Sequence, residues 1–234
     1  MMFKRKKDKQ ETKQNTPGLV SVINPKSIVA EQFRMVRTNL EFSIVDKELK
    51  SLLVTSLIPA SGKSTISSNL ASTFAAQNKK VLLVDTDMRK PTIHKIFHLR
   101  NNEGLSTLIT SKEAKVTDFI EEVEYENVYV LTSGATPPNP AELISSKRME
   151  QLIEEMEQIF DLVIFDTPPV MAVADSQIMA GKVDGTLFVL RKGVDTKEQI
   201  LIAKERMDSV NANVLGVIYN RVETSDNDYY YEYI

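Results

Sequence analysis

A strand followed by a short loop and the residues Gly-Lys-Ser-Thr constrains the fold of this chain more than any other segment. The run Leu-Val-Thr-Ser at 53–56 is typical of a buried strand, and residues 62–65 supply the tetrapeptide at the start of a predicted helix. A loop between these elements can wrap backbone N–H groups around phosphate oxygens, and the N-terminus of the helix adds a partial positive charge. The segment therefore predicts a phosphate-binding loop.

The individual residues of this loop predict which ligand it holds. Lys63 can reach the β- and γ-phosphates of a nucleotide, and the Ser64 hydroxyl can ligate Mg²⁺. A strict GxxxxGK[ST] pattern has glycine where Leu57 stands, so the prediction rests on the tetrapeptide and its strand–loop–helix context. The candidate nucleotide-binding residues are Pro59, Ala60, Ser61, Gly62, Lys63, Ser64 and Thr65.

The nucleotide base has one further candidate contact. Asn220 ends the last predicted strand and could face the base, although a turn at the strand end explains this asparagine nearly as well. A full Asn-Lys-x-Asp signature for guanine is missing from the sequence, which favours ATP over GTP. ATP and Mg²⁺ are therefore the expected ligands.

Two apolar runs end in aspartates. Residues 81–84 precede Asp85 and Asp87, and residues 162–165 precede Asp166. Residues two apart on a strand point to the same face, so Asp85 and Asp87 can point into one cleft. Mg²⁺ keeps most of its waters and takes few carboxylates, which leaves one acid free to accept a proton. The pattern indicates metal-assisted phosphoryl transfer or hydrolysis; in the alternative, Asp85 and Asp87 are helix caps or turn residues.

Short β-rich runs alternate with helical segments along the chain. Several of the strand runs are hydrophobic without interruption, which is typical of strands covered on both faces. The predicted strands are 51–56, 80–87, 127–134, 161–168, 185–190 and 213–220. With 234 residues, we expect a single α/β domain: one doubly wound, mostly parallel sheet with helices on both faces. Ligands should bind at the carboxyl ends of the strands.

The ends of the chain differ in charge from its body. Residues 4–13 are mostly basic, whereas residues 223–234 contain four acids and neither Lys nor Arg. We expect a flexible basic lead at 1–24, a phosphate-loop domain at 25–222 and a flexible tail at 223–234. The lead is either a solvated end or a contact for anionic lipid. Because the body shows no clustered basic face, nucleic-acid binding is not expected.

Composition also limits the cellular context. The chain has no cysteine, and it has no apolar run long enough to span a membrane. The basic start is not followed by the apolar region of a signal peptide. We therefore expect a cytoplasmic protein that reaches a membrane only through a partner or through charge.

The tail concentrates tyrosines beside acids, at Tyr229, Tyr230, Tyr231 and Tyr233. One interpretation is a merely disordered tail. The other is an autophosphorylation cluster whose hydroxyls enter the active site of a neighbouring subunit. Each phosphate would add about −1.5 to −2 charges, and the repulsion would separate associated subunits.

Taken together, the motifs at 59–65, 84–91, 136–143 and 165–169 resemble those of the bacterial tyrosine kinases of the capsule and exopolysaccharide type. These kinases are cytoplasmic relatives of the MinD/ParA ATPases, and the resemblance extends from about residue 25 to residue 220. It implies that Asp85 is the base that activates the acceptor tyrosine. Asp87 and Asp166, together with Ser64, would hold Mg²⁺, with the aspartates acting mostly through water.

The resemblance also extends to assembly, and it includes one departure. Glu31, Arg34 and Arg37 resemble the ExxRxxR motif through which such kinases pack into a ring, although a solvated helix face is the alternative. The phosphate loop of the family usually reads Pro-Gly-x-Gly-Lys, and here Ala60 replaces the first glycine. If that position requires a positive φ, alanine costs about 1 kcal/mol there.

The function implied by the resemblance is a protein-tyrosine kinase. It would transfer the γ-phosphate of ATP to protein tyrosines, including those of its own tail in trans, and regulate capsule or exopolysaccharide synthesis or export. The implied partners are a membrane adaptor that activates the kinase, other copies in a homo-oligomeric ring and a cognate tyrosine phosphatase. The adaptor would recruit the chain to the inner face of the membrane.

Two alternatives remain. The first is an ATPase switch of the MinD/ParA type that acts in membrane-associated positioning. The tyrosine tail argues against it, as does the absence of a lysine in the first half of the loop. The second is a nucleotide-bound scaffold without enzymatic activity.

Overall fold

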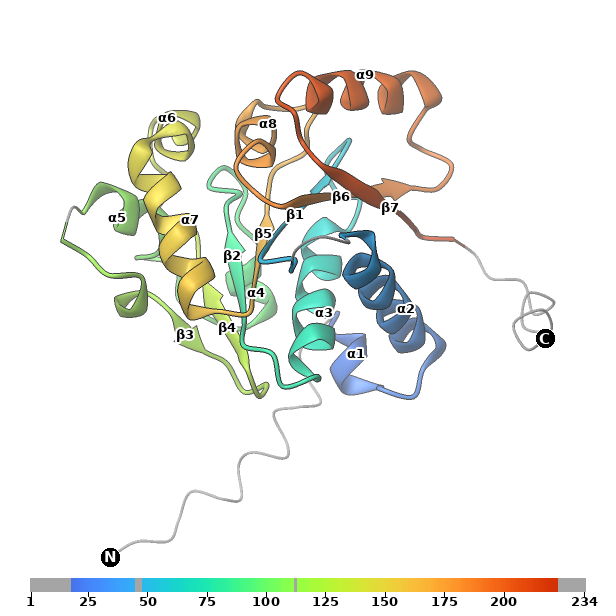
Figure 1. Cartoon of the computed structure of the whole chain (residues 1–234), viewed down its shortest axis with the longest axis horizontal. Helices are drawn as coiled ribbons and strands as arrows, with labels where there is room; N and C mark the ends of the chain where they lie inside the picture. Colours follow the sequence, from blue (N-terminus) through green and yellow to red (C-terminus); the bar gives the residue numbers. More distant parts are fainter. Residues whose placement is uncertain (1–17, 45–47, 112, 223–234) are drawn as a thin grey trace, which may run out of the picture.

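A seven-stranded sheet forms the centre of the computed structural model, which describes residues 18–44, 48–111 and 113–222 (Figure 1). The strand order is β3-β4-β2-β5-β1-β6-β7. The parallel strands are β1 (Ser51–Ser56), β2 (Val81–Asp85), β4 (Val128–Leu131), β5 (Leu162–Asp166), β6 (Gly185–Arg191) and β7 (Val214–Asn220). The short β3 (Glu121–Glu122) pairs antiparallel with β4. This arrangement confirms the predicted α/β fold with a mostly parallel sheet.

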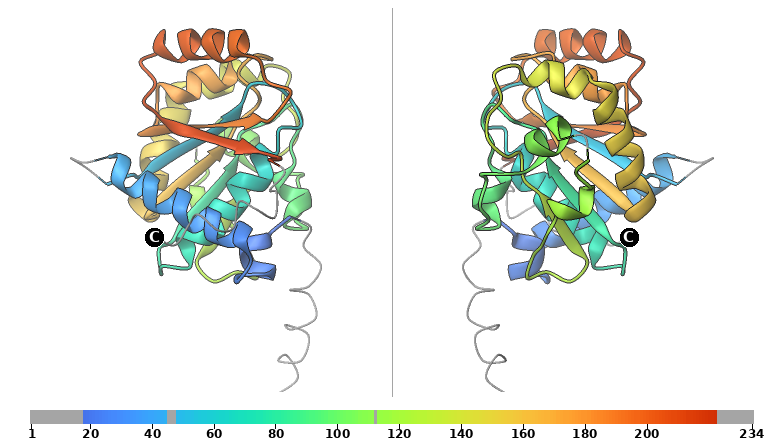
Figure 2. Two further views of the ribbon diagram at one scale, coloured as in Figure 1. Left: turned by 90° about the vertical axis from the view of Figure 1, so that its right-hand side faces the viewer. Right: turned by 90° about the vertical axis from the view of Figure 1, so that its left-hand side faces the viewer.

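Helices cover both faces of the sheet, as the two edge views in Figure 2 show. One face carries α1 (Val20–Ile23), α2 (Ile28–Ser43), α3 (Lys63–Ala75) and α4 (Ile93–Ile96). The other face carries α5 (Leu105–Thr110), α6 (Pro140–Ser145), α7 (Lys147–Ile159), α8 (Asp175–Ala180) and α9 (Lys197–Asp208), together with a 3₁₀ helix at Val116–Asp118. The doubly wound arrangement is therefore also confirmed.

The uninterrupted apolar runs follow from this double coverage. In β1, Leu52 and Val54 pack into the core on the α3 side, whereas Leu53 packs into the core on the α7 side. Successive side chains of a strand point to opposite faces, so a strand with a core on each side has no position for a solvated residue. All six residues of β1 are buried accordingly.

The predicted strands at 80–87 and 161–168 end earlier than expected, at Asp85 and Asp166. These two aspartates are register partners on the neighbouring strands β2 and β5. The phosphate loop leaves the next strand, β1, at the same edge of the sheet. The topology therefore brings the loop and the acids together. The sequence analysis missed β3, because two exposed glutamates carry no strand pattern.

The packed structure begins before the expected boundary at residue 25. Leu19 is completely buried in the core beside α3. The backbone N–H and the hydroxyl of Ser21 both donate to Asn69 Oδ1 on α3, at 2.9 Å each. Residues 18–23 therefore support the helix that carries the phosphate loop. The rest of the expected lead, residues 1–17, lies outside the described residues.

We predict that Leu19→Ala destabilises the protein by about 2–4 kcal/mol, because it leaves a cavity in the core against α3. Ile23→Ala, four residues further on, serves as the matched control, since the Ile23 side chain is 43% exposed. Urea unfolding followed by circular dichroism measures both variants. Equal and small effects would mean that residues 18–23 do not pack on α3 in solution.

Candidate functional site

The phosphate loop connects β1 to α3 through a backbone that favours glycine at one position. Gly62 precedes α3 with φ of 93°, in the left-handed region. A Cβ atom at Gly62 would lie 2.3 Å from the side-chain nitrogen of Asn220. The left-handed conformation therefore favours glycine, and a side chain here would also displace the Asn220 amide.

Asn220, at the end of the outermost strand β7, supports this loop by a hydrogen bond. Its amide nitrogen donates to the Ser61 carbonyl at 2.8 Å, and its amide oxygen accepts from the Arg221 backbone N–H at 2.9 Å. The Arg221 guanidinium also donates to the Ala60 carbonyl, at 3.3 Å. The contact of Asn220 with the nucleotide base remains a prediction; in the described structure its amide supports the loop.

Ala60, which stands where the related kinases usually have glycine, has a positive φ. Its φ is 62°, which lies in the left-handed region that disfavours a Cβ atom. The condition set by the sequence analysis is therefore met, and the loop contains local strain at this position.

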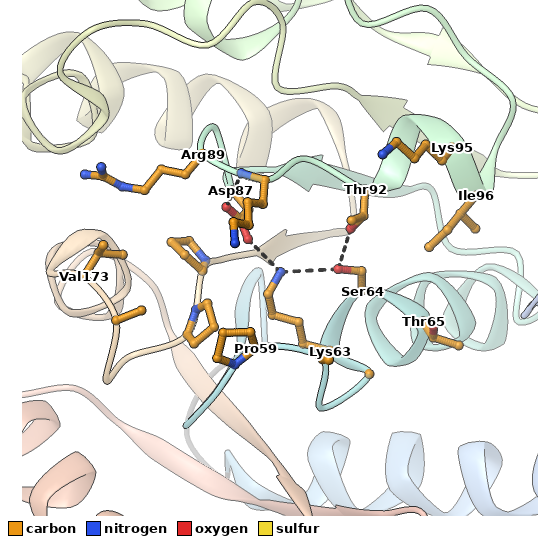
Figure 3. Close-up of a pocket in the computed structure, with 16 residues that line it drawn as sticks. Pro59, Lys63, Ser64, Thr65, Asp87, Arg89, Thr92, Lys95, Ile96 and Val173 are labelled. Carbon is orange, nitrogen blue, oxygen red and sulfur yellow. Dashed lines mark hydrogen bonds and ion pairs between the residues drawn. The ribbon is translucent and has the colours of Figure 1, made fainter.

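The Lys63 ammonium group contacts two acidic side chains, and Figure 3 shows one of them, Asp87, joined to it by a dashed line. Its Nζ lies 3.1 Å from Asp87 Oδ2 and 3.2 Å from Asp166 Oδ2, and the side chain is 11% exposed. Burial by itself would lower the pKa of Lys63, but Asp166, Asp87 and Asp85 raise it above its ordinary value. Lys63 is therefore positively charged at neutral pH.

Asp166 also accepts hydrogen bonds from two serine hydroxyls of α3. Its Oδ2 accepts from the Ser64 hydroxyl at 2.6 Å, and its Oδ1 accepts from the Ser67 hydroxyl at 3.1 Å. Burial raises the pKa of Asp166, while Lys63 and Ser64 act in the opposite direction. The structure therefore places Lys63, Ser64 and Asp166 in direct contact.

Asp85 is fully buried, and both of its oxygens accept backbone hydrogen bonds. Oδ2 accepts from the N–H groups of Thr92 and Ile93 at 3.0 Å each, and Oδ1 accepts from the Asp87 N–H at 3.1 Å. Asp85 thus caps the start of α4, as the alternative interpretation held. Burial, followed by repulsion from Asp166, raises its pKa to about 7. A carboxyl with that pKa is suited to exchange protons near neutrality.

The structure adds residues that the sequence analysis missed. The Thr92 hydroxyl donates to Ser64 Oγ at 2.8 Å, so one residue contacts Asp85 through its backbone and Ser64 through its side chain. Arg89 forms two hydrogen bonds with Asp175, at 2.9 and 3.2 Å, and ties the loop after β2 to α8. The signal for them in the sequence was their position just after Asp85 and Asp87, at residues 89–92.

Lys63, Ser64, Arg89 and Thr92 line a cavity of about 630 Å³ at the carboxyl edge of the sheet. Its floor is the phosphate loop, and Asp87 is the member of the aspartate cluster (Asp85, Asp87 and Asp166) that lines it. The volume lies within the range of small-molecule sites. Among the described residues, no group of three or more His, Asp or Glu side chains forms a complete metal cage.

A magnesium ion nevertheless fits this donor set. The Ser64 hydroxyl and the carboxylates of Asp87 and Asp166 are hard oxygen donors, and Mg²⁺ is usually held by one or two carboxylates together with phosphate and water. Three carboxyl groups are buried here and two of them contact the single Lys63 ammonium group, so an additional positive charge is favoured. The residues present therefore fit a magnesium-bound nucleotide.

The three candidate assembly residues on α2 divide into two kinds. Glu31 and Arg34 pair with each other at the surface, where Arg34 Nε donates to Glu31 at 2.7 Å. Arg37 instead turns inward, with a 13% exposed side chain that donates to the Thr73 carbonyl of α3 at 3.2 Å. Glu31 and Arg34 thus lie at the surface of α2, while Arg37 fixes α2 to α3.

Some predicted features fall outside the described residues. The four tail tyrosines belong to this group, because residues 223–234 are not described. Within the described part of the chain, no helix is long and apolar enough to cross a membrane.

Comparison with known proteins places these features in a family. A family profile described as an AAA domain matches residues 59–185. Tyrosine-protein kinase YwqD of Bacillus subtilis is 44% identical over 213 residues, which cover 91% of this chain and 90% of that protein. A putative tyrosine-protein kinase, CapB of Staphylococcus aureus, is 43% identical over 209 residues, covering 89% of this chain and 91% of that protein.

Solved structures agree with this placement. The kinase domain of the Escherichia coli tyrosine kinase ETK superposes with a TM-score of 0.84 at 34% identity, covering 89% of this chain and 81% of that one. The cell division ATPase MinD of Pyrococcus furiosus superposes with a TM-score of 0.63 at 22% identity, covering 76% of this chain and 74% of that one. The latter likeness concerns the fold alone.

We predict that Ala60→Gly stabilises the protein by about 0.5–1 kcal/mol, because glycine relieves the left-handed strain at this position. Ala76→Gly is the matched control, since Ala76 ends α3 with φ of −61° and glycine should be mildly destabilising there. Chemical denaturation measures both variants. Destabilisation of the same size in both would contradict a left-handed conformation at residue 60.

Proposed function

The chain belongs to the family of bacterial tyrosine-protein kinases, and on that premise we propose how its own residues carry out the reaction. The γ-phosphoryl group of Mg-ATP passes to protein tyrosines, among them Tyr229, Tyr230, Tyr231 and Tyr233 of a neighbouring copy. The observation that carries this proposal is the buried contact of Lys63 with Asp87 and Asp166 at the end of the phosphate loop.

The phosphate loop provides the binding and the orientation. The backbone of residues 59–65 surrounds the phosphates, and the charged Lys63 neutralises the β- and γ-phosphate oxygens. When bound, Mg²⁺ supplies further charge neutralisation at these oxygens. Ser64, Asp87 and Asp166 are the residues that would hold it. Lys63 is held by both carboxylates, so its position is fixed before substrate arrives.

Asp85 is the proposed base. The acceptor tyrosine Oη forms a bond to the γ-phosphorus, the bond from that phosphorus to the bridging oxygen breaks, and ADP leaves. The phenolic proton passes to a carboxylate, and the raised pKa of Asp85 suits that task near neutral pH. Asp85 Oδ1 accepts one backbone hydrogen bond and keeps a second lone pair for the proton, whereas Oδ2 already accepts two. Since Asp87 lines the cavity and Asp85 does not, the assignment requires a direct comparison of the two.

Regulation follows from charge and assembly. We propose a homo-oligomeric ring to which Glu31 and Arg34 contribute a surface, with tail tyrosines entering the cavity of a neighbour. Phosphate on the tail adds negative charge and separates the subunits. A membrane adaptor activates the kinase and recruits it to the inner face of the membrane. A cognate phosphatase reverses the modification, and the cycle regulates capsule or exopolysaccharide synthesis or export.

The two alternatives have less support. The likeness to MinD is limited to the fold at 22% identity, whereas relatives at 43–44% identity carry the name of tyrosine kinases. A scaffold without activity has no support among these relatives either, because they carry the names of kinases.

We predict that Lys63→Met abolishes phosphorylation of the tail. Asp85→Asn should lower the rate about 10²-fold or more while ATP binding is retained, since a general base contributes about 10²–10⁴-fold. The assay incubates the full chain with labelled ATP, Mg²⁺ and a candidate adaptor peptide, and mass spectrometry then examines the C-terminal peptide. Calorimetry measures ATP affinity, and thermal melting establishes that each variant is folded.

Asp87→Asn is the comparison variant for the base. If Asp87 serves the metal, its loss weakens Mg²⁺-dependent nucleotide binding, and excess Mg²⁺ partly restores labelling. Undiminished labelling by Asp85→Asn, with loss only in Asp87→Asn at full nucleotide affinity, would transfer the role of base to Asp87. Free phosphate without labelled tyrosine would instead support the ATPase switch.

A second prediction concerns Thr92 and the proposed metal ligand. Thr92→Val removes the hydroxyl that donates to Ser64, so the Mg²⁺ concentration for half-maximal labelling should rise about threefold to tenfold. Thr92→Ser keeps the hydroxyl and should remain near the parent value. A magnesium dependence that is the same in the valine and serine variants would show that this hydrogen bond does not position Ser64.

A further inference from the structure

The cavity contains more than a phosphate site, and its two walls differ in chemistry (Figure 3). One wall is apolar and includes Pro168, Pro169 and Val173, which follow the end of β5. The opposite side includes Lys95 on α4, and Lys90 also lines the cavity. The residues that hold phosphate lie between these walls, at the floor. A group bound above the floor therefore meets an apolar surface and positive charge at once.

The positive charge at this cavity is not compensated within the described structure. Arg89 is neutralised, because Asp175 binds it through two hydrogen bonds. Lys90 and Lys95 are both exposed, and no carboxylate of the described residues forms an ion pair with either of them. Lys63, in contrast, is matched by two aspartates. The cavity thus offers two free ammonium groups to whatever binds there.

We propose that Lys90 and Lys95 select tyrosines flanked by carboxylates, so that the preferred acceptor is an acidic tyrosine peptide. The inference rests on the proposed kinase function and adds its substrate class. An aromatic ring suits the proline- and valine-lined wall, and carboxylates beside it suit the two lysines. The charges then contribute to recognition of the acceptor, whereas Lys63 serves the nucleotide.

The tail of this chain has the sequence that such a site would prefer. Asp228 directly precedes Tyr229, and Glu232 lies between Tyr231 and Tyr233. Residues 223–234 contain four acids and no basic residue, so nothing in the tail opposes its approach to the lysines. Adjacent residues of an extended chain lie about 3.3–3.5 Å apart along its axis. A flanking carboxylate therefore stays close to the mouth of the cavity when its tyrosine is bound.

The test compares two acceptor peptides on the full chain. One is the peptide of residues 223–234, and the other carries Asp226→Asn, Asp228→Asn and Glu232→Gln. The enzyme carries phenylalanine in place of the four tail tyrosines, so that its own tail does not compete. The readout is the ratio of kcat/KM for the acidic peptide to kcat/KM for the neutralised peptide, measured with Mg-ATP and the adaptor peptide that supports tail labelling.

We expect this ratio to be about tenfold in the parent, since each exposed ion pair changes an equilibrium constant by up to a few-fold. Lys90→Glu and Lys95→Glu should each reduce it about threefold or more. Lys80→Glu is the matched control with the same change in charge, because Lys80 is exposed and directly precedes β2, at the opposite edge of the sheet. Raising the ionic strength from about 0.05 to about 0.5 M should also reduce the parent ratio.

Each remaining outcome is decisive. Equal rates on both peptides, or equal ratios in all three lysine variants, would overturn the selection of acidic tyrosines while leaving the kinase function intact. A rise in KM for ATP without any change in the peptide ratio would assign Lys90 and Lys95 to the triphosphate instead. Phosphorylation of neither peptide by the folded parent would contradict the proposed transfer to the tail itself.

Discussion

The contact of one buried ammonium group with two buried carboxylates is the interaction on which the site depends. Lys63 lies 3.1 Å from Asp87 and 3.2 Å from Asp166 in surroundings that leave its side chain 11% exposed. Removing such charges from water is costly, so each is tolerated only because the others are present. The excess of acid over base favours an additional cation at the cavity floor. Burial, followed by repulsion from Asp166, raises the pKa of Asp85 to about 7.

The doubly wound sheet places these charges together. Asp85 and Asp166 are register partners at the ends of β2 and β5, and β1 delivers the phosphate loop next to β5. Because parallel strands end at the same edge, loop and acids meet without any long connection. Contacts from elsewhere in the chain then fix the details: Asn220 holds the loop, and Thr92 holds Ser64.

The residues around Lys63 are connected to two further parts of the proposed mechanism, the proton acceptor and the acceptor peptide. In the interior, Asp85 is both the cap of α4 and the proposed base. The proposed proton acceptor is therefore in direct contact with the helix that carries Lys95. Toward the surface, Lys90 and Lys95 leave positive charge at the cavity. A chain of net charge −3 with acids concentrated beside its tail tyrosines complements that charge. The position of the acceptor is therefore proposed to depend on electrostatics as well as on the apolar wall.

The sequence by itself determined the phosphate loop, the two acid-tipped strands, the doubly wound fold and the family. Each of these follows from local patterns, such as a strand, a loop and a helix in succession. Such patterns depend mainly on interactions between residues that are near one another in the sequence. Only the tertiary structure decided that Asp85 caps α4, that Thr92 contacts Ser64, that Arg37 turns toward α3 and that residues 18–23 join the core. These contacts join loops and helices whose relative placement depends on how the whole sheet packs. No periodicity or motif in the sequence predicts that placement.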